Sequence, residues 1–307
     1  MNFIETLLEK DFILSEAAVI EACKRSDEVS LHPDLENALL IYDAAGRRVL
    51  SSLYCEFIAV AHDADVPVII CAPTWRAGSE RLLEAGIKSD VNGDAVKFLK
   101  DLRGEWGPWQ KNIFIGGLVG CKNDCYRPDM CLEQEPATAY HLQQIDRLVE
   151  AGADFLLAAT LPAFTEAAGI AKAMERTGIP YIISFVIDRT GRILDGTSLA
   201  YAIDTIDSMC DNPPSGYMIN CSYPSFLNAS EQPESVFKRL IGFQANASSL
   251  DHSELDGSET LRVDEISDWG DRMLELYRKY CVKILGGCCG TGSAHLKYIV
   301  ENIKGET

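Results

Sequence analysis

The stretch from residue 139 to residue 187, AYHLQQIDRLVEAGADFLLAATLPAFTEAAGIAKAMERTGIPYIISFVI, decides the fold because helix and strand patterns alternate along it. The spacing of its apolar residues predicts helices over Ala139–Ala151 and Phe164–Thr177. The runs Phe155–Thr160 and Tyr181–Ile187 are short and apolar, as in strands that are buried on both faces. Such a helix–strand–helix–strand order is typical of a parallel sheet.

The same alternation continues in both directions. Six further apolar runs are predicted strands: Phe12–Ser15, Val66–Ala72, Ile113–Val119, Tyr217–Cys221, Ile241–Ala245 and Lys283–Gly287. Helical spacing covers three further segments: Leu35–Ala61, where a break is left open, Asp264–Tyr280 and Ser293–Ile303. Eight strand–helix repeats over 307 residues fit a closed (β/α)8 TIM barrel. The alternative is a doubly wound open sheet, which usually has a glycine-rich phosphate loop after its first strand. Here Ser15-Glu16-Ala17-Ala18 stands at that point, which favours the barrel.

Composition and length indicate a single domain over residues 1–307. The hydrophobic content of 47% is enough for a large core, and no linker or repeat divides the chain. The segments with the most loop-like composition are Gly104–Lys111, Asn123–Pro136 and Ala247–Thr260. One α/β barrel therefore accounts for the whole sequence.

The charge excludes several classes of partner. Lys and Arg number 28 against 46 Asp and Glu, so a net charge of −18 disfavours nucleic acid and anionic membrane surfaces. No apolar run approaches the roughly 18 to 20 residues of a membrane span. Met1–Lys10 has two glutamates and no basic region, which argues against a secretory signal. We therefore expect a cytoplasmic protein whose 11 cysteines are reduced.

Three of these cysteines stand at predicted strand ends. Cys221 closes the sixth strand, and Cys288 and Cys289 follow the eighth. Because the carboxyl ends of barrel strands meet at the active-site face, the three thiols are expected at one mouth. Three thiolates can bind Zn²⁺ and leave a fourth position for a ligand. The alternatives are a disulfide between Cys288 and Cys289, or two ordinary buried cysteines with Cys221 unrelated.

The block Gly286-Gly287-Cys288-Cys289-Gly290-Thr291, followed by Ala294-His295-Leu296, resembles the ending of the homocysteine S-methyltransferase family. The resemblance extends over almost the whole chain. Gly152–Pro162 is similar to the fourth strand of the family and Ser184-Phe185 to the fifth, while Asn220-Cys221 matches its upstream zinc cysteine. Asn246 falls where the family has a Pro-Asn segment.

This resemblance implies an S-methyltransferase that moves a methyl group from a small-molecule donor to the thiol of homocysteine and so forms methionine. It implies a Zn²⁺ cofactor on Cys221, Cys288 and Cys289, and no catalytic residue beyond the activated thiol of the substrate. The substrate-binding residues would include Glu16, Thr74, Asn220 and Asn246. The partners are then a small thiol and a methyl donor, with a separate corrinoid methyl-carrier protein left open.

Several substrate-binding positions depart from the family pattern, among them two that concern a carboxylate. The family begins its barrel with Asp-Gly where this chain has Ser15-Glu16, and its fourth strand ends in a Glu-Thr-x-Pro segment where this chain has Ala159. Glu16 either replaces the lost carboxylate from a neighbouring strand or is a surface residue. Two alternative functions remain. One is methyl transfer to a different thiol acceptor, and the other is a barrel that keeps its zinc as a sensor or scaffold without turnover. Cys121, Cys125 and Cys131 form a further cluster, interpreted as loop cysteines with a second metal or redox role left open.

Overall fold

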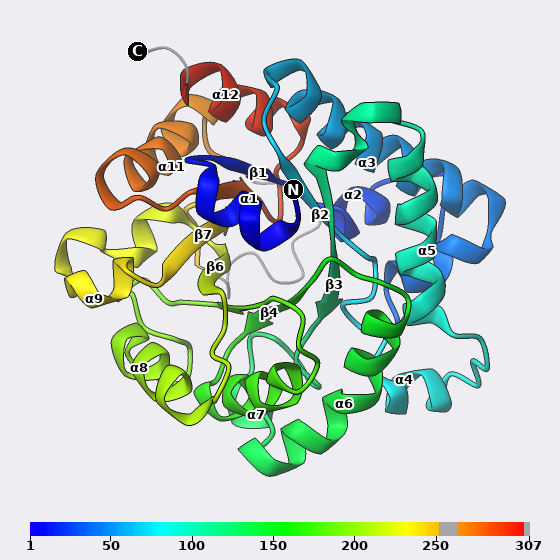
Figure 1. Cartoon of the computed structure of the whole chain (residues 1–307), viewed down its shortest axis with the longest axis horizontal. Coiled ribbons are helices and arrows are strands. Elements are labelled where there is room, and N and C mark those ends of the chain that lie inside the picture. Colours follow the sequence, from blue (N-terminus) through cyan, green and yellow to red (C-terminus); the bar gives the residue numbers. More distant parts are fainter. Residues whose placement is uncertain (252–262, 304–307) are drawn as a thin grey trace.

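The strands close into a barrel (Figure 1). The computed structural model describes residues 1–251 and 263–303. Within these ranges, parallel strands pair in chain order from β1 to β8, and β8 pairs with β1. The strands are β1 (Ile13–Ser15), β2 (Val68–Cys71), β3 (Ile113–Val119), β4 (Phe155–Leu161), β5 (Tyr181–Phe185), β6 (Gly216–Ser222), β7 (Leu240–Ala245) and β8 (Ile284–Gly287). The expected (β/α)8 barrel is confirmed, and each predicted strand agrees with these bounds to within two residues.

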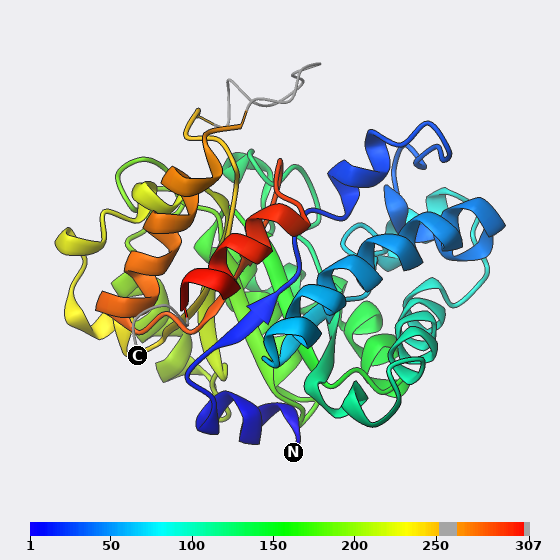
Figure 2. The same ribbon diagram turned by 90° about the horizontal axis from the view of Figure 1, so that it is seen from above.

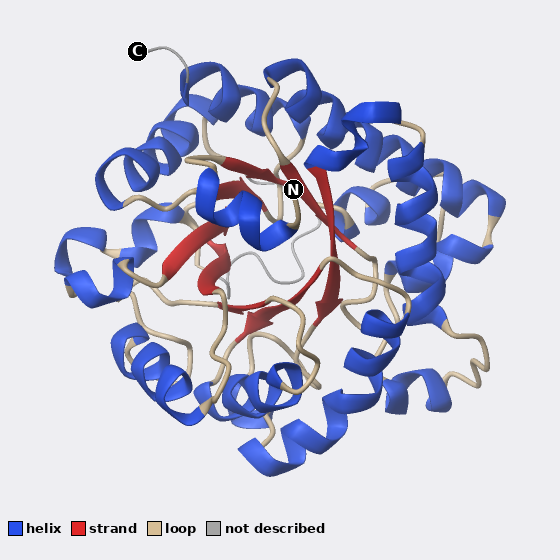
Figure 3. Ribbon diagram, viewed as in Figure 1, coloured by secondary structure: helices blue, strands red, loops and turns tan. Residues whose placement is uncertain are grey.

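Helices surround the strands on the outside (Figure 3). The α-helices are α1 (Phe3–Glu9), α2 (Ile20–Lys24), α3 (Ala44–Ala64), α4 (Ser79–Glu84), α5 (Val91–Gly104), α6 (Gln134–Glu150), α7 (Phe164–Glu175), α8 (Leu199–Met209), α9 (Glu234–Phe237), α11 (Ile266–Tyr280) and α12 (Ser293–Ile303). Short 3-10 helices are η1 (Asn37–Tyr42), η2 (Gly107–Asn112), η3 (Pro128–Met130), η4 (Pro224–Leu227) and η5 (Ala229–Glu231). The apolar pattern leaves α1, α2, α4, α5, α8 and α9 unpredicted. Three of them, α2, α4 and α9, have only five, six and four residues, too few for a helical period to show.

Apolar side chains fill the inside of the barrel, and α1 covers one of its ends. The inner cluster comprises Phe3, Leu7, Ile13, Ile69, Cys71, Phe114, Phe155, Leu157, Ala159, Ile182, Met218 and Ile284. The Phe3 ring of α1 stacks on Phe155, with ring centroids 4.2 Å apart. Figure 2 shows α1 at one end of the barrel and α2 at the other. Because α1 and these side chains fill one end, the open mouth lies at the end where α2 follows β1.

The structure decides one point that the sequence left open and corrects one predicted loop. The segment predicted as a helix over Leu35–Ala61 is broken, because Asp43 ends η1 and accepts a hydrogen bond from Gly46 N (2.7 Å) as the N-cap of α3. Helix α6 begins at Gln134, inside a predicted loop, since proline is tolerated in a first helical turn. The predicted loop Ala247–Thr260 falls mostly on residues 252–260, which lie outside the described residues.

Irregular pairing at the ends of β4 and β6, which lie on either side of β5, shapes the mouth. The register of β4 shifts between Ala158 and Leu161, and that of β6 shifts between Asn220 and Ser222. Thr160 and Cys221, at these shifts, have φ values of 63° and 53°, in the left-handed region. Such a conformation is uncommon for any residue with a Cβ and an outlier for a β-branched one. Backbone strain of this kind is concentrated at functional sites.

Candidate metal centre and substrate cavity

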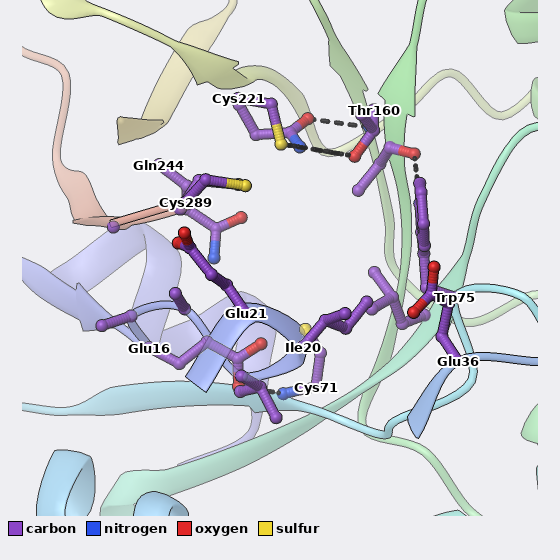
Figure 4. A pocket seen from close by; sticks show the side chains of 18 of the residues that line it. Glu16, Ile20, Glu21, Glu36, Cys71, Trp75, Thr160, Cys221, Gln244 and Cys289 are labelled. Carbon is purple, nitrogen blue, oxygen red and sulfur yellow. Dashed lines mark hydrogen bonds between the residues drawn. The ribbon is translucent and has the colours of Figure 1, made fainter. Parts of the chain in front are cut away.

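A cavity of about 680 Å³ opens at the carboxyl ends of the strands. Its walls come from residues within β4 and β6 and from the ends of β1, β2, β3, β7 and β8 with the segments that follow them. Figure 4 shows side chains from several of these segments converging on one space. This volume is within the range typical of small-molecule sites in proteins.

Cys221, Cys288 and Cys289 lie together in the cavity wall. Their sulfur atoms all lie within 4.8 Å of one another, and within residues 1–251 and 263–303 no other set of three or more His, Cys, Asp or Glu side chains is grouped in this way. Cys221 is buried, Cys288 is half-buried and Cys289 is exposed. All 11 cysteines are free thiols, so a disulfide between Cys288 and Cys289 is not what brings them together.

Backbone hydrogen bonds fix the Cys288–Cys289 pair after β8. Cys288 N donates to Ala245 O (2.8 Å), and Ala247 N donates to Cys289 O (2.9 Å). Thr291 Oγ1 donates to Cys288 O (2.6 Å). The pair is thus held between the end of β7 and the start of α12, with both sulfurs toward the cavity that Cys221 lines from β6.

A buried amide supports the third sulfur. Asn220 Oδ1 accepts hydrogen bonds from Thr160 N (2.8 Å) and from Ser184 Oγ (2.7 Å). Its Nδ2 donates to Thr160 Oγ1 (2.7 Å) and to Cys221 Sγ (3.2 Å). Asn220, 4% exposed, therefore joins the two irregular strand ends and orients the Cys221 sulfur. Asn220, which we expected to bind substrate, thus supports Cys221 and also lines the cavity.

Hydrogen bonds among the sulfurs separate the pKa values of the thiols. Bonds with Cys288 and Cys289 raise the pKa of Cys221 well above its usual range. Bonds from Cys221 and Cys288 hold the pKa of Cys289 well below its usual range. One thiol of the three thus loses its proton readily, as a metal ligand must. Three soft sulfur donors at this spacing fit a thiophilic divalent metal ion.

The cysteines of the segment after β3 do not form a second metal centre of this kind among the described residues. Cys121 and Cys125 are buried, and Cys121 Sγ lies 3.3 Å from Asn123 O. The buried Glu166 carboxylate holds the same segment by accepting from Lys122 N (2.7 Å) and Leu132 N (3.2 Å). These contacts fit the interpretation of Cys121, Cys125 and Cys131 as loop cysteines.

Glu16 lies inside the cavity wall, so the surface alternative is wrong. It is only 7% exposed, and its Oε2 accepts a hydrogen bond from Cys71 N (2.8 Å). Burial raises the pKa of this carboxyl group to about 8, although the Cys71 bond opposes the rise. The group can therefore keep its proton at neutral pH until a cation binds next to it.

The two remaining expected substrate residues differ in position. Asn246 lines the cavity, and its Nδ2 donates to Cys221 O (2.9 Å). Its Oδ1 is buried and has no hydrogen-bond partner among the described residues, which leaves an acceptor for a ligand. Contrary to the prediction, Thr74 does not line the cavity. It is fully buried, and its hydroxyl donates to Leu118 O (2.7 Å). Thr74 shapes the loop after β2 instead.

The wall at Ala159 is closed by an aromatic ring. Trp75 Nε1 donates to Ala159 O (3.4 Å), and the Arg76 guanidinium lies 4.1 Å from the centre of the Trp75 ring. A Cβ at Gly120 would lie 2.6 Å from this ring, so glycine is required there. The position where the family has a carboxylate is thus an apolar wall beside an indole.

Three further residues that line the cavity were not predicted from the sequence. Gln244 and Glu21 line the cavity, as does Tyr126. Gln244 precedes Asn246 by two residues, so strand alternation could have placed both on one face. Glu21 lies on a five-residue helix and gave no periodic signal.

Comparison with known proteins points to one family. The model of the homocysteine S-methyltransferase family matches residues 5–303. Homocysteine S-methyltransferase YbgG of Bacillus subtilis (strain 168) is 24% identical over 179 residues, which are 57% of this chain and 54% of that protein. The match thus spans about half the length of this curated relative.

Solved structures agree on the fold. The metallated form of the homocysteine methyltransferase MmuM from Escherichia coli has a TM-score of 0.76 and 18% identity, covering 97% of this chain and 98% of that one. Its oxidized form has a TM-score of 0.76 and 18% identity, covering 98% and 100%. Among the described helices of this chain, none has the length and apolar character that a membrane crossing requires. From the match over residues 5–303, the chain belongs to the homocysteine S-methyltransferase family.

Proposed function

We propose that this protein transfers a methyl group from a small-molecule donor to the thiol of homocysteine, giving methionine, with Zn²⁺ held by Cys221, Cys288 and Cys289. The observation that carries the proposal is the grouping of three sulfur atoms within 4.8 Å in the wall of a cavity of about 680 Å³. Membership of the family supports the same reaction.

The chemical need is for a thiolate. A free thiol has a pKa of about 8.5 and is mostly protonated at neutral pH, whereas the thiolate is the nucleophile. A zinc ion at the three cysteines would keep a bound thiol deprotonated. The substrate releases its thiol proton to solvent on binding, and its sulfur then forms a bond to the methyl carbon. The bond between that carbon and the donor breaks, and its electron pair stays on the donor.

The side chains around the sulfurs supply orientation rather than acid–base chemistry. Asn220 Nδ2 donates to Cys221 Sγ (3.2 Å) and so restricts the direction of this sulfur. Groups that fix a metal ligand in this way are needed to keep the ligand set in one arrangement. Thr160 contributes through Asn220, to which its backbone N–H donates (2.8 Å).

The acceptor is recognised by hydrogen-bond acceptors in the wall. Glu16 offers a buried carboxyl group, and Asn246 offers a buried Oδ1 that has no partner within residues 1–251 and 263–303. Both suit the ammonium group of an amino-acid thiol, which can donate three hydrogen bonds. In this proposal the ammonium group displaces the proton of Glu16, whose carboxylate then forms a charge-assisted hydrogen bond.

A second candidate is methyl transfer to a thiol that has no amino group. The apolar wall formed by Ala159 and Trp75 favours it, because this wall offers no charge to an ammonium group. The metal chemistry would be the same in both cases. The two candidates therefore differ only in which thiol is accepted.

The test is methionine formation from homocysteine by the zinc-loaded protein, with a panel of donors. The panel contains S-methylmethionine, S-adenosylmethionine, betaine and a methylated corrinoid protein. We expect turnover with at least one free small-molecule donor and none in a Cys288→Ser variant. Cys281→Ser is the matched control, because Cys281 is exposed and lies outside the cavity lining. Turnover of simple alkyl thiols without turnover of homocysteine would favour the second candidate, and absence of turnover with every thiol would refute the proposal.

A further inference from the structure

Glu21 reaches from the segment after β1 to the loop after the adjacent strand β8, which carries two of the cysteines. It belongs to α2, which follows β1, and its Oε2 accepts a hydrogen bond from Gly290 N, 269 residues along the chain. Figure 4 shows the Glu21 carboxylate directed toward the Cys289 main chain. Arg25 donates to the other oxygen, Oε1, at 2.8 Å. The carboxylate is thus fixed by a donor on each of its oxygens.

The hydrogen bond between Glu21 and Gly290 lies next to Cys289 in the loop after β8, where it can restrict this cysteine. Gly290 follows Cys289 directly and has a φ of 82°, where the chain turns toward α12. The carbonyl groups of Cys288 and Cys289 are held by Thr291 and Ala247. The bond from Glu21 holds the next amide group along the chain, and so limits the rotation of the exposed Cys289 from the side of α2.

Glu21 is not one of the grouped ligands. The set of side chains whose ligand atoms lie within 4.8 Å of one another contains the three cysteines and leaves Glu21 out. Its oxygens already accept from Gly290 and Arg25. The Glu21 carboxylate is therefore placed to orient a metal ligand, Cys289, rather than to bind the ion itself.

We propose that Glu21 is a positioning residue of the metal centre: its hydrogen bond to Gly290 holds Cys289 where its sulfur shares an ion with Cys221 and Cys288. The inference rests on the proposed metal site. Groups that orient metal ligands typically contribute about 10- to 100-fold to metal affinity. The same bond links metal binding to α2, whose residues line the mouth through which substrate enters.

Two variants distinguish the effect of the length of the Glu21 side chain from the effect of its charge. Glu21→Gln keeps the length of the side chain and an oxygen acceptor but loses the charge, whereas Glu21→Asp keeps the charge and is one methylene too short. Glu28→Ala is the control, since Glu28 is an exposed carboxylate 3.9 Å from Arg48 and outside the cavity lining. Zinc affinity is measured by competition with a chromophoric chelator. Cobalt(II) replaces zinc in a second measurement, in which the thiolate-to-metal absorption reports the ligand set.

We expect one zinc ion in the wild type, affinity within about threefold in Glu21→Gln and Glu28→Ala, and a loss of about 10- to 100-fold in Glu21→Asp. The cobalt absorption of Glu21→Asp should weaken, while the thermal unfolding of its metal-free form stays unchanged. Wild-type affinity in Glu21→Asp, or a loss in Glu21→Gln as large as in Glu21→Asp, would overturn the inference about Glu21. Absence of metal from the wild type would instead refute the proposed metal site.

Discussion

Replacement of Glu16 by Gln tests how the protein recognises its acceptor. The amide has nearly the shape of the carboxyl group and can still accept the hydrogen bond from Cys71 N, which is 2.8 Å long in the wild type. It cannot become negative. The Glu16→Gln variant should therefore keep its fold and lose only the charge that we propose pairs with the ammonium group of homocysteine.

The size of the expected effect follows from the burial of the group. Glu16 is 7% exposed, so its bond to an ammonium group would be little weakened by solvent. A hydrogen bond to a charged partner contributes about 1.5–3 kcal/mol. At about 1.4 kcal/mol for each tenfold change, Glu16→Gln should weaken homocysteine binding about 10- to 150-fold. A thiol without an amino group should bind equally well to both proteins.

Proton release gives an independent measure. Because the pKa of Glu16 is about 8 in the free protein, the group carries a proton at pH 7 and must lose it when an ammonium group binds. Methionine is the suitable ligand, since it has the ammonium group but no thiol proton. Calorimetry in buffers of different ionisation enthalpy should show up to about one proton released from the wild type and none from Glu16→Gln.

The stability of the free protein should depend on pH with a definite sign. A carboxyl group whose pKa rises from 4.5 to about 8 on folding binds its proton more tightly in the folded state. Its contribution is fully present below pH 4.5 and is lost as pH rises to about 8, at about 1.4 kcal/mol for each pH unit. Denaturant unfolding between pH 5 and pH 9 should show this decline in the wild type and a flatter profile in Glu16→Gln. Glu28→Gln, at an exposed glutamate, should behave as the wild type does.

Unchanged affinity for both homocysteine and methionine in Glu16→Gln would refute this account of recognition. The acceptor would then be a thiol without an amino group, and the wall formed by Ala159 and Trp75 would be the better guide to its chemistry.

Three further predictions concern the cavity and its surroundings. Cys288→Ser should lose bound zinc by elemental analysis, because two sulfur ligands hold the ion far less tightly than three, and full zinc content would contradict the assignment. Cys125→Ala should keep one zinc per chain, since Cys125 is not part of the grouped sulfur set, and loss of metal with the fold intact would point to a different ligand set. Adding Ala159→Glu to Glu16→Gln should recover about tenfold in homocysteine affinity by calorimetry, because both positions line one cavity, and no recovery would show that position 159 cannot reach the ammonium group.

The fold could be predicted from sequence because strand and helix patterns alternate throughout. Buried parallel strands are short apolar runs, and these were recognisable even where helices such as α2 were too short to show a period. The alternation also placed Cys221, Cys288 and Cys289 at strand ends, which is why the grouping of the sulfurs could be expected. The break at Asp43 depends on a single capping bond, which the apolar pattern alone does not determine.

The finer features of the site depend on local backbone geometry and on long-range contacts. Nothing in the residue types indicated that Thr160 and Cys221 adopt left-handed conformations, since a β-branched residue argues against one. Thr74 has a polar side chain at a strand end, but the turn after β2 directs its hydroxyl to Leu118 O. The bond between Glu21 and Gly290 joins segments 269 residues apart, and no local pattern predicts it.

We propose that Cys221, Cys288 and Cys289 hold a zinc ion to which the thiol of homocysteine binds. Zinc K-edge X-ray absorption, recorded before and after addition of homocysteine, tests it most directly because sulfur at about 2.3 Å is readily distinguished from nitrogen or oxygen at about 2.0–2.2 Å. We expect three sulfur ligands in the free protein and four once homocysteine is bound. Fewer than three sulfur ligands in the free protein, or no added sulfur with homocysteine, would contradict it.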